Sequence, residues 1–272
     1  MSGLHHVLLI GGPPASGKTA VATRLARRHG LRWYNADTKT WEHRDRALAA
    51  GSEAARRWEA MTIEERGRMT PEEAFKLTLH AERGPMVVDD LRQLPESPIT
   101  VAEGSTLAAS VVSPGTVDPA RAIWLIPTEE FQRELLEARG LAGETTAFYG
   151  FLRERIADEA ERHRAPTLLV DGSLDVGGVL RLVETRFAEA LAQGPRAATV
   201  GERAALLREA NESIAAQVRG YFSRPWARGD AGQVEREFFC ECGDVTCDAT
   251  VRTSVAAAEA SPVLAHAIPP AA

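Results

Sequence analysis

Apolar residues occur along the chain in short runs that are separated by longer amphipathic stretches. The short runs predict β-strands over 5–10, 31–35, 99–102, 122–126 and 167–170. The stretches between them have apolar residues at helical spacing and predict helices over 18–28, 46–60, 71–82, 86–94, 106–112, 129–139, 147–163 and 176–191. This alternation is typical of a parallel sheet with helices on both faces. We therefore predict an α/β fold built on a doubly wound parallel sheet of about five strands.

The composition of the chain changes near residue 192. Residues 193–201 contain glycine, proline and threonine and predict a linker, and residues 202–217 have the pattern of a helix. Three cysteines follow, and the chain closes on a segment rich in proline and alanine. We therefore divide the chain into a domain at 1–192, a linker at 193–201, and a small C-terminal unit at 202–272 made of a helix and a cysteine-containing tail.

A glycine-rich segment follows the first predicted strand and has the Walker A spacing Gly-x-x-x-x-Gly-Lys-Thr. Such a loop wraps backbone N–H groups around phosphates at a helix N-terminus, where the helix dipole favours anions. The lysine reaches the β- and γ-phosphates of ATP, and the threonine hydroxyl binds Mg²⁺. The chain has only three lysines, and one of them stands here. The predicted nucleotide-binding residues are Gly12, Pro13, Pro14, Ala15, Ser16, Gly17, Lys18 and Thr19.

Size and charge narrow the class of protein further. The chain has 272 residues and a net charge of −6, which argues against general binding to nucleic acids. No apolar run approaches the roughly 20 residues that a membrane-spanning helix needs, and the N-terminus has no signal-peptide pattern. We therefore expect a cytoplasmic protein that binds no membrane. The oligomeric state is not readable from the sequence.

Residues 5–192, with this loop and this alternation, resemble the P-loop kinases that phosphorylate nucleotides and small metabolites. That group includes adenylate, gluconate and shikimate kinases and the chloramphenicol phosphotransferases. The resemblance implies an enzyme that moves the γ-phosphate of ATP·Mg²⁺ to a hydroxyl group of a small molecule. The alternative is a regulatory NTPase that acts as a nucleotide-dependent switch and signals through the cysteine-rich tail. The sequence has neither a guanine-specific N/TKxD motif nor an arginine-finger segment, and both would favour the alternative.

Acidic residues follow the second and third predicted strands. In similar kinases an acidic residue at the position of Asp37 orients the acceptor hydroxyl or accepts its proton, although Asp37 could instead cap the following helix. His43 and Arg44 either contact substrate or lie on an exposed helix face. The resemblance implies that Glu103 holds Mg²⁺ through water and that Gly104 lets a ligand approach the backbone. An ordinary strand-to-helix turn is the alternative for Glu103.

The segment over 129–163 corresponds to the lid of similar kinases. There, arginines close over the transferred phosphoryl group, because guanidinium groups match the charge that develops on its oxygens. Arg139 and Arg153 are the candidates, and solvated arginines paired with nearby glutamates are the alternative. The resemblance also implies that Asp171, Gly172 and Ser173, after the fifth strand, contact the adenine ring of ATP. A plain turn, with Ser173 or Asp175 as a helix cap, is the alternative.

The three cysteines, Cys240, Cys242 and Cys247, have the spacing C-x-C-x₄-C. In a cytosolic chain such crowding favours metal ligands over disulfides. Zn²⁺ takes four ligands, and the fourth could come from His266, Asp244, Asp248 or a partner chain. Reduced structural cysteines and a redox switch are the alternatives. This tail also resembles a cysteine-containing module of uncharacterised actinobacterial proteins.

Overall fold

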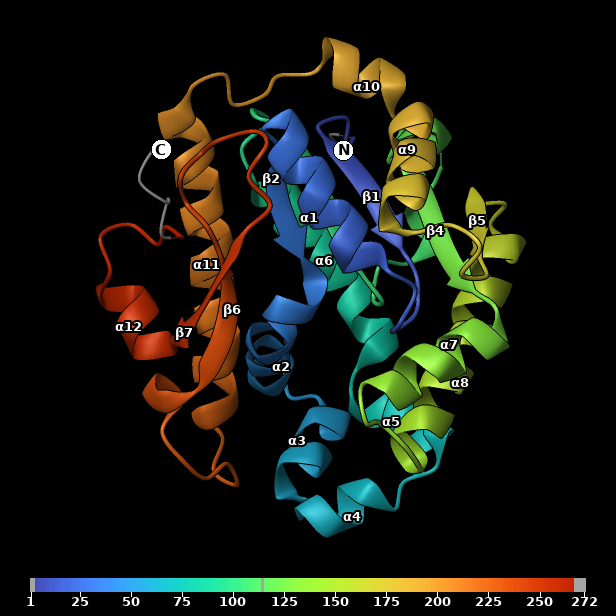
Figure 1. The fold of residues 1–272 in the computed structure, drawn as a ribbon. Helices are drawn as coiled ribbons and strands as arrows, with labels where there is room; N and C mark the ends of the chain where they lie inside the picture. The colour runs from blue at the N-terminus through green and yellow to red at the C-terminus, as the bar shows by residue number, and fades with distance from the viewer. Residues whose placement is uncertain (1–2, 114, 267–272) are drawn as a thin grey trace.

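One five-stranded parallel sheet forms the centre of the protein (Figure 1). The computed structural model describes residues 3–113 and 115–266. The strands are β1 (Val7–Gly11), β2 (Arg32–Asn35), β3 (Thr100–Gly104), β4 (Ala122–Pro127) and β5 (Thr167–Val170), and their order is β2-β3-β1-β4-β5. Every residue of β1 and β3 is buried, as expected for central strands that are covered on both faces. The predicted fold class and all five predicted strands are confirmed.

Helices cover both faces of the sheet, and the sheet divides the hydrophobic core into two layers. Helices α1 (Lys18–His29), α9 (Val176–Arg186) and α10 (Ala188–Gln193) pack on the face that Leu8 and Ile10 enter. Helices α6 (His80–Gln93) and α8 (Glu144–Arg162) pack on the opposite face, which Val7 and Leu9 enter. Successive residues of β1 thus point to opposite layers, and the two-residue repeat of a strand explains why its sequence is continuously apolar.

A series of helices, most of them short, connects β2 to β3. They are the 3₁₀ helix η1 (Ala36–Lys39), α2 (Thr40–Ala49), α3 (Glu53–Ala60), α4 (Ile63–Gly67), α5 (Pro71–Leu77) and α6. The predicted single helix over 46–60 is wrong, because the chain turns at Gly51, which has a φ of 81°, and Ser52 then caps α3. The predicted helix over 71–82 is likewise divided, at Leu79, which has a φ of 60°.

Two further helix predictions need correction. Residues 106–112 form no α-helix and contain only the 3₁₀ helix η2 (Ala109–Val111). In this segment Leu107, Ala109 and Val112 are buried in the core, and this packing overrides a weak helical pattern that contains β-branched residues. The predicted helix over 176–191 is divided into α9 and α10 at Phe187, which is fully buried.

Two further helices flank β4. The 3₁₀ helix η3 (Pro119–Arg121) precedes β4, and α7 (Glu129–Ala138) follows it.

None of the helices in residues 3–113 and 115–266 combines the length and the apolar character that crossing a membrane requires. The cytoplasmic location itself stays a prediction.

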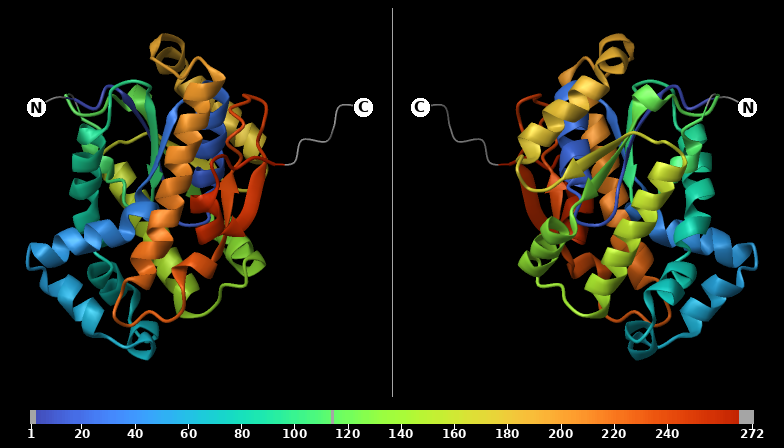
Figure 2. Two further views of the ribbon diagram at one scale, coloured as in Figure 1. Left: turned by 90° about the vertical axis from the view of Figure 1, so that its left-hand side faces the viewer. Right: turned by 90° about the vertical axis from the view of Figure 1, so that its right-hand side faces the viewer.

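The residues after 193 pack along one side of the sheet (Figure 2). Helix α11 (Val200–Phe222) contacts β2 and α2, and the antiparallel strands β6 (Glu235–Phe239) and β7 (Thr250–Ser254) lie against it, with the 3₁₀ helix η4 (Ala231–Gln233) and α12 (Val255–Ala260). The predicted helix over 202–217 is confirmed within α11. The segment predicted as a linker is hydrogen-bonded to the main sheet region, because Ile99 N–H donates to the Pro195 carbonyl at 2.9 Å. A domain boundary near residue 192 stays a prediction.

Candidate functional site

The glycine-rich loop between β1 and α1 has a strained backbone that only small residues tolerate. Gly12 and Gly17 have φ values of 144° and 79°, and a Cβ at Gly12 would lie 2.4 Å from the Leu125 carbonyl oxygen. Ala15 also has a positive φ, of 63°, and such strain persists where a loop is shaped for a function. No side chain caps α1, and its first turn contains no acidic residue. Its first N–H groups are therefore suited to an anion.

Lys18 and Gln132 fix the loop from two sides. The Lys18 side chain is buried and its Nζ donates to the Pro13 carbonyl at 3.4 Å, so the ammonium group lies over the loop. Gln132, from α7, is buried and donates from Nε2 to the carbonyl oxygens of Pro14, at 2.9 Å, and Tyr149, at 3.2 Å. The loop is thus tied to the helices of the predicted lid. Sequence reasoning missed Gln132, since a lone amide on an amphipathic helix carries no signal.

Glu103 lies at the carboxyl end of β3, between Ile10 of β1 and Asn35 of β2. It is fully buried, and within the described residues neither of its carboxylate oxygens has a hydrogen-bond partner. Burial raises the pKa of Glu103 to about 7. The positive charge of Lys18 opposes this rise, and the negative charge of Asp37 adds to it. The Thr19 hydroxyl lies near this carboxylate, outside hydrogen-bonding geometry, and lowers the pKa slightly. An unsatisfied carboxylate beside a threonine hydroxyl is a donor set that suits a hydrated Mg²⁺ ion.

Asp37 lies in η1 and its carboxylate caps no helix. Asn35 is the N-cap, because its Oδ1 accepts from the Asp37 N–H at 2.7 Å. The Asp37 carboxylate instead accepts from the Ser105 hydroxyl at 3.5 Å, and its backbone carbonyl accepts from Gln217 of α11 at 3.0 Å. The capping alternative for Asp37 is therefore wrong, and the side chain is directed toward the end of β3.

Gly104 allows β3 and η1 to approach each other. A Cβ at Gly104 would lie 2.6 Å from the Ala36 Cβ, so any other residue would push η1 away from the sheet. The close approach that the sequence predicted for a ligand is made here by the chain itself. Its consequence is that Asp37 and Ser105, which follow Ala36 and Gly104 directly, meet above the sheet.

Two basic residues of α6, the partly buried His80 and the buried Arg83, lie near Asp37. Burial lowers the pKa of His80 to about 4, helped by the positive charge of Arg83 and opposed by Asp37. Burial also lowers the pKa of Arg83, and the negative charge of Asp37 opposes that shift. Arg83 donates to the Ala36 carbonyl and, at 3.3 Å, to His43 Nδ1. Sequence reasoning missed both residues, because the helix pattern of this region places them no differently from solvent-facing basic residues.

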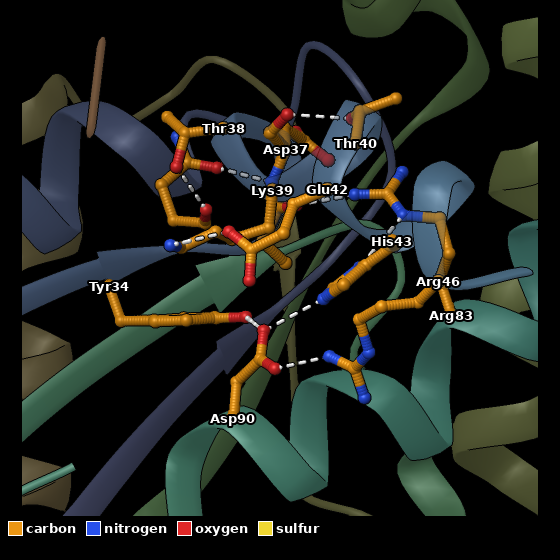
Figure 3. A network of polar contacts seen from close by, with 12 residues as sticks. Tyr34, Asp37, Thr38, Lys39, Thr40, Glu42, His43, Arg46, Arg83 and Asp90 are labelled. Carbon is orange, nitrogen blue, oxygen red and sulfur yellow. Dashed lines mark hydrogen bonds and ion pairs between the residues drawn. The ribbon is translucent and has the colours of Figure 1, made fainter. Parts of the chain in front are cut away.

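Asp90 of α6 organises a polar network beneath η1 and α2 (Figure 3). Its carboxylate contacts His43 Nε2 at 2.7 Å and accepts from the Tyr34 hydroxyl at 2.7 Å and from Arg46 at 2.6 Å. His43 is fully buried and Arg44 is nearly so, so the exposed-face alternative for these two residues is wrong. His43 orients Arg83, as the 3.3 Å contact shows. The network therefore holds α2 and α6 in the positions that surround Asp37.

The Asp90→Ala variant is expected to lower the free energy of unfolding by about 3 kcal/mol near neutral pH, since it leaves Tyr34 and His43 buried without their acceptor. Burial alone would raise the pKa of Asp90, but hydrogen bonds from His43 and Tyr34 hold it below its usual value. The carboxylate thus stabilises the fold above its unfolded pKa, and this stabilisation is lost as the pH falls through the folded pKa. Urea unfolding should show the stability deficit of the variant shrinking as the pH falls below the usual pKa range of an aspartate.

Asp89→Ala is the matched control for this change, because Asp89 is exposed and forms a surface ion pair with Arg92, at 3.4 Å. We expect it to unfold like the wild-type protein. An equal loss of stability in the two variants would show that the Asp90 network is not what holds α6.

A cavity of about 300 Å³ opens beside Ser105, between α5, α6 and α8. Phe75 stacks on His80 at a centroid separation of 5.0 Å, and the Arg155 guanidinium lies 5.4 Å from the Phe75 ring centre. Arg162 and Glu159 also line the cavity. Its walls therefore offer an aromatic surface, hydroxyl groups and positive charge next to Asp37.

The predicted lid arginines occupy different surroundings. Arg139 is the C-terminal cap residue of α7 and is exposed. Arg153, on α8, is largely buried and pairs with Glu129 at 3.4 Å and with Glu154 at 3.5 Å. It lines a hollow between α7 and α8 that Gln132 also lines. The roles of both arginines in phosphoryl transfer stay predictions.

The loop after β5 forms a compact turn of its own. The Ser173 N–H and hydroxyl donate to Asp171 Oδ1 at 2.9 and 2.6 Å, and Gly172 has a φ of 85°. Asp175 is the N-cap of α9, because its Oδ1 accepts from Gly178 N–H at 2.7 Å. Contact of Asp171, Gly172 and Ser173 with adenine stays a prediction.

The cysteines converge with a histidine at the end of β6. The ligand atoms of Cys240, Cys242, Cys247 and His266 all lie within 4.8 Å of one another. His266 Nδ1 is 3.0 Å from Cys240 Sγ and 3.7 Å from Cys247 Sγ. Of the candidates for a fourth ligand, the structure brings His266 to the cysteines, whereas Asp244 and Asp248 are not among the grouped side chains. Three thiols and one imidazole form a ligand set that can hold Zn²⁺.

Comparisons with known proteins give matches among solved structures alone. No family model matches the chain, and no curated protein does. Among solved structures, deoxyadenosine kinase from M. mycoides is 13% identical with a TM-score of 0.42, and the match covers 67% of this chain and 98% of that one. An uncharacterised Eubacterium ventriosum protein is 10% identical with a TM-score of 0.34 and coverage of 67% and 98%. A Chloroflexus aurantiacus protein with a provisional kinase name is 15% identical with a TM-score of 0.31 and coverage of 66% and 98%.

Scores of this size do not bear on the chemistry of the site. The functional interpretation therefore depends on the residues of this chain and on the positions they occupy. Three features matter most: the glycine-rich loop before α1, the unsatisfied carboxylate of Glu103, and the Asp37 carboxylate near it.

Proposed function

We propose that the protein is an ATP-dependent phosphotransferase that moves the γ-phosphate of ATP·Mg²⁺ to a hydroxyl group of a small molecule. One observation carries the proposal: the buried, unsatisfied Glu103 carboxylate lies at the carboxyl end of the sheet with Lys18, Thr19 and Asp37 as its charged and polar neighbours. Ligands of open parallel sheets bind at the carboxyl ends of the strands, where the connections that leave two neighbouring strands run in opposite directions. Here those strands are β1 and β3, because β1 connects to β2 at one edge of the sheet and β3 connects to β4 on the far side of β1.

The residues divide the work of phosphoryl transfer among them. Backbone N–H groups of residues 15–19 hold the phosphates, since Pro13 and Pro14 have no N–H to donate, and Lys18 neutralises charge on the β- and γ-phosphates. Thr19 and Glu103 hold Mg²⁺, with Glu103 acting through water. An Mg²⁺ ion would supply positive charge to the phosphate oxygens and satisfy the Glu103 carboxylate, which has no hydrogen-bond partner among residues 3–113 and 115–266.

Asp37 positions the acceptor and takes its proton. Its carboxylate accepts from the Ser105 hydroxyl and is near enough to Glu103 and Arg83 for its negative charge to act on both groups. An acceptor in the neighbouring cavity would direct its hydroxyl toward Asp37. Arg139 and Arg153 then approach the transferred group when α7 and α8 close, and Asp171, Gly172 and Ser173 contact the base.

A regulatory NTPase remains the second candidate, and one contact favours it. Arg27, on the helix that follows the glycine-rich loop, donates to Cys247 Sγ at 3.6 Å and to the Ala249 carbonyl at 3.2 Å. A movement of α1 on hydrolysis would therefore reach the cysteine-rich tail directly. This function needs no acceptor and no role for Asp37.

Turnover of ATP by the purified full-length chain separates the two functions. We expect ³¹P NMR to show a new phosphate ester when the protein is incubated with ATP, Mg²⁺ and a panel of nucleosides, sugars and hydroxylated antibiotics. Transfer to one acceptor class, with ADP formed in equal amount, supports the phosphotransferase. Hydrolysis to ADP and phosphate that no acceptor stimulates would instead support the regulatory NTPase.

Magnesium binding is expected to weaken below neutral pH. Because burial raises the pKa of Glu103 to about 7, protons compete with Mg²⁺, and the affinity for ATP·Mg²⁺ should fall by up to about tenfold per pH unit below 7.

The ionisation of Glu103 also affects the stability of the ligand-free protein, and the sign of this effect is the reverse of that for Asp90. The raised pKa favours the folded state at low pH, and about 3 kcal/mol of stability is lost as the pH rises from 4.5 to 7.

Glu103→Gln is the matched variant, since it keeps the shape of the side chain and cannot ionise. Calorimetric titration should show that the variant has lost the pH dependence of Mg²⁺ binding together with most of the binding. Its melting temperature without ligand should change less between pH 5 and 8 than that of the wild type. Unchanged Mg²⁺ dependence in Glu103→Gln would remove Glu103 from the metal site.

A further inference from the structure

We propose that Cys240, Cys242, Cys247 and His266 bind one Zn²⁺ ion in a closed, structural site that fastens the C-terminal segment to α1 and α11. The four ligand atoms lie within 4.8 Å of one another, which is the spread that a tetrahedral ion with Zn–S distances near 2.3 Å can draw together. Four protein ligands leave no position for water or substrate. The site is therefore of the structural kind and is separate from the phosphotransferase chemistry.

The backbone of this region presents the three sulfur atoms to one point. Cys240 ends the strand segment and its N–H donates to the Ala249 carbonyl at 3.1 Å, which fixes it opposite the start of β7. The chain then turns at Gly243, which has a φ of 71°, and the Cys247 N–H donates to the Asp244 carbonyl at 3.3 Å. This tight turn between Cys242 and Cys247 returns the third sulfur to the first two.

Glu241, between the first two cysteines, brings the distant histidine to the site. Its side chain is buried, its N–H donates to the Leu264 carbonyl at 2.6 Å, and its carboxylate accepts from the Leu264 N–H at 3.0 Å. Glu241 thus binds both the N–H and the carbonyl of Leu264. Because Leu264 lies two residues before His266, these bonds hold the backbone that leads to the histidine. The carboxylate is satisfied in turn by Asn211 at 2.7 Å and by Arg208 at 2.5 Å, both from α11. Such outer contacts orient metal ligands in known sites.

Asn211 anchors the strand that leads into the site. It accepts from the Phe239 N–H at 2.8 Å and donates to the Phe239 carbonyl at 3.0 Å. A buried asparagine whose amide pairs with one backbone residue fixes the register of β6 on α11. Together, Asn211 and Glu241 hold the backbone near Cys240 and His266 through protein contacts alone, and such support is what a metal site requires.

One arginine contacts a sulfur atom of the cluster, and a second lies at the turn between Cys242 and Cys247. Three thiolates and one Zn²⁺ ion have a net charge of −1, and Arg27 donates to Cys247 Sγ at 3.6 Å. Arg203 lies on the same side and donates to the Gly243 carbonyl at 2.6 Å. His266 presents Nδ1 to the sulfurs, so its proton would lie on Nε2. The ligand set is soft and nitrogen-containing, which selects Zn²⁺ over Mg²⁺ or Ca²⁺.

Metal analysis of the full-length chain tests the proposal. We expect one Zn²⁺ per chain by mass spectrometry of the purified protein, and none after Cys242→Ser or His266→Ala. When Co²⁺ replaces Zn²⁺, a thiolate-to-cobalt charge-transfer band and the intense visible bands of tetrahedral cobalt should appear. The His266→Cys variant should keep one Zn²⁺, because four cysteines also form a structural zinc site.

Asp248→Asn is the control, since Asp248 adjoins Cys247 but is not among the grouped ligands. It should keep full metal content. Two results would overturn the proposal. One is three freely titratable thiols and no metal in a folded protein, which would identify reduced structural cysteines. The other is an intramolecular disulfide in the protein as isolated, which would identify a redox pair. Cobalt titration of the wild-type chain gives a result even if the substituted chains do not fold.

Discussion

Lys18→Ala is expected to lower phosphoryl transfer about a thousandfold, because the charge that develops on the transferred group loses its nearest cation. Lys18 makes one long hydrogen bond, to Pro13, and burying its charge costs free energy. The variant should therefore fold at least as well as the wild type, and its melting temperature should not fall. The measurement is the rate of acceptor-dependent ADP release at saturating ATP, together with ATP affinity by calorimetry.

Lys39→Ala is the matched control for this change. Lys39 is partly exposed and pairs with the exposed Glu42 at 2.9 Å, and its loss should leave the rate within about twofold, as expected for such a pair. A Lys18→Ala enzyme that transfers phosphate at the wild-type rate would show that the glycine-rich loop is not the phosphate site.

Asp37→Asn is expected to lower kcat by about a hundredfold to ten-thousandfold while leaving ATP affinity unchanged, since a proton acceptor acts on the hydroxyl and not on the nucleotide. The amide keeps the shape of the carboxylate and can still contact Ser105. The loss should therefore lie in the chemical step rather than in folding. Single-turnover kinetics with a good acceptor separate transfer from product release.

The rate of ATP hydrolysis without acceptor distinguishes a loss of acceptor activation from a general loss of activity. If Asp37 acts on the acceptor, slow ATP hydrolysis by water without acceptor should persist in Asp37→Asn. Asp89→Asn, at an exposed position paired with Arg92, should behave like the wild type. Wild-type transfer in Asp37→Asn would contradict the assigned role and favour the regulatory NTPase.

The sheet could be predicted because its signal is local. Each buried strand is a short apolar run, and the loop after β1 combines glycine, lysine and threonine at a spacing that is typical of phosphate-binding loops. The positions of Glu103 and Asp37 followed from their place after strands, since parallel strands bring their carboxyl ends to one edge. The structure brings these two carboxylates near each other.

The parts that could not be predicted depend on contacts between distant residues. His80 and Arg83 have the pattern of ordinary helix-face residues, and only the fold brings them to Asp37. The break at Leu79 has no glycine or proline to announce it, and Pro85 lies inside α6 rather than before it. Asp90 and His43 are far apart in sequence yet 2.7 Å apart in space, and a single sequence contains no signal for such a pair.

The two edges of the sheet differ in how they are covered. Helix α11 contacts the edge strand β2, and Phe239 of the cysteine-containing unit packs edge-to-face on Trp33 of that strand at 5.4 Å. At the other edge, β5 leaves Leu169 65% exposed. A fragment that ended near residue 192 would thus uncover Trp33 and open a second strand edge to pairing with other chains. The C-terminal unit thus protects the preceding residues from association with other chains. We expect those residues, if produced alone, to aggregate.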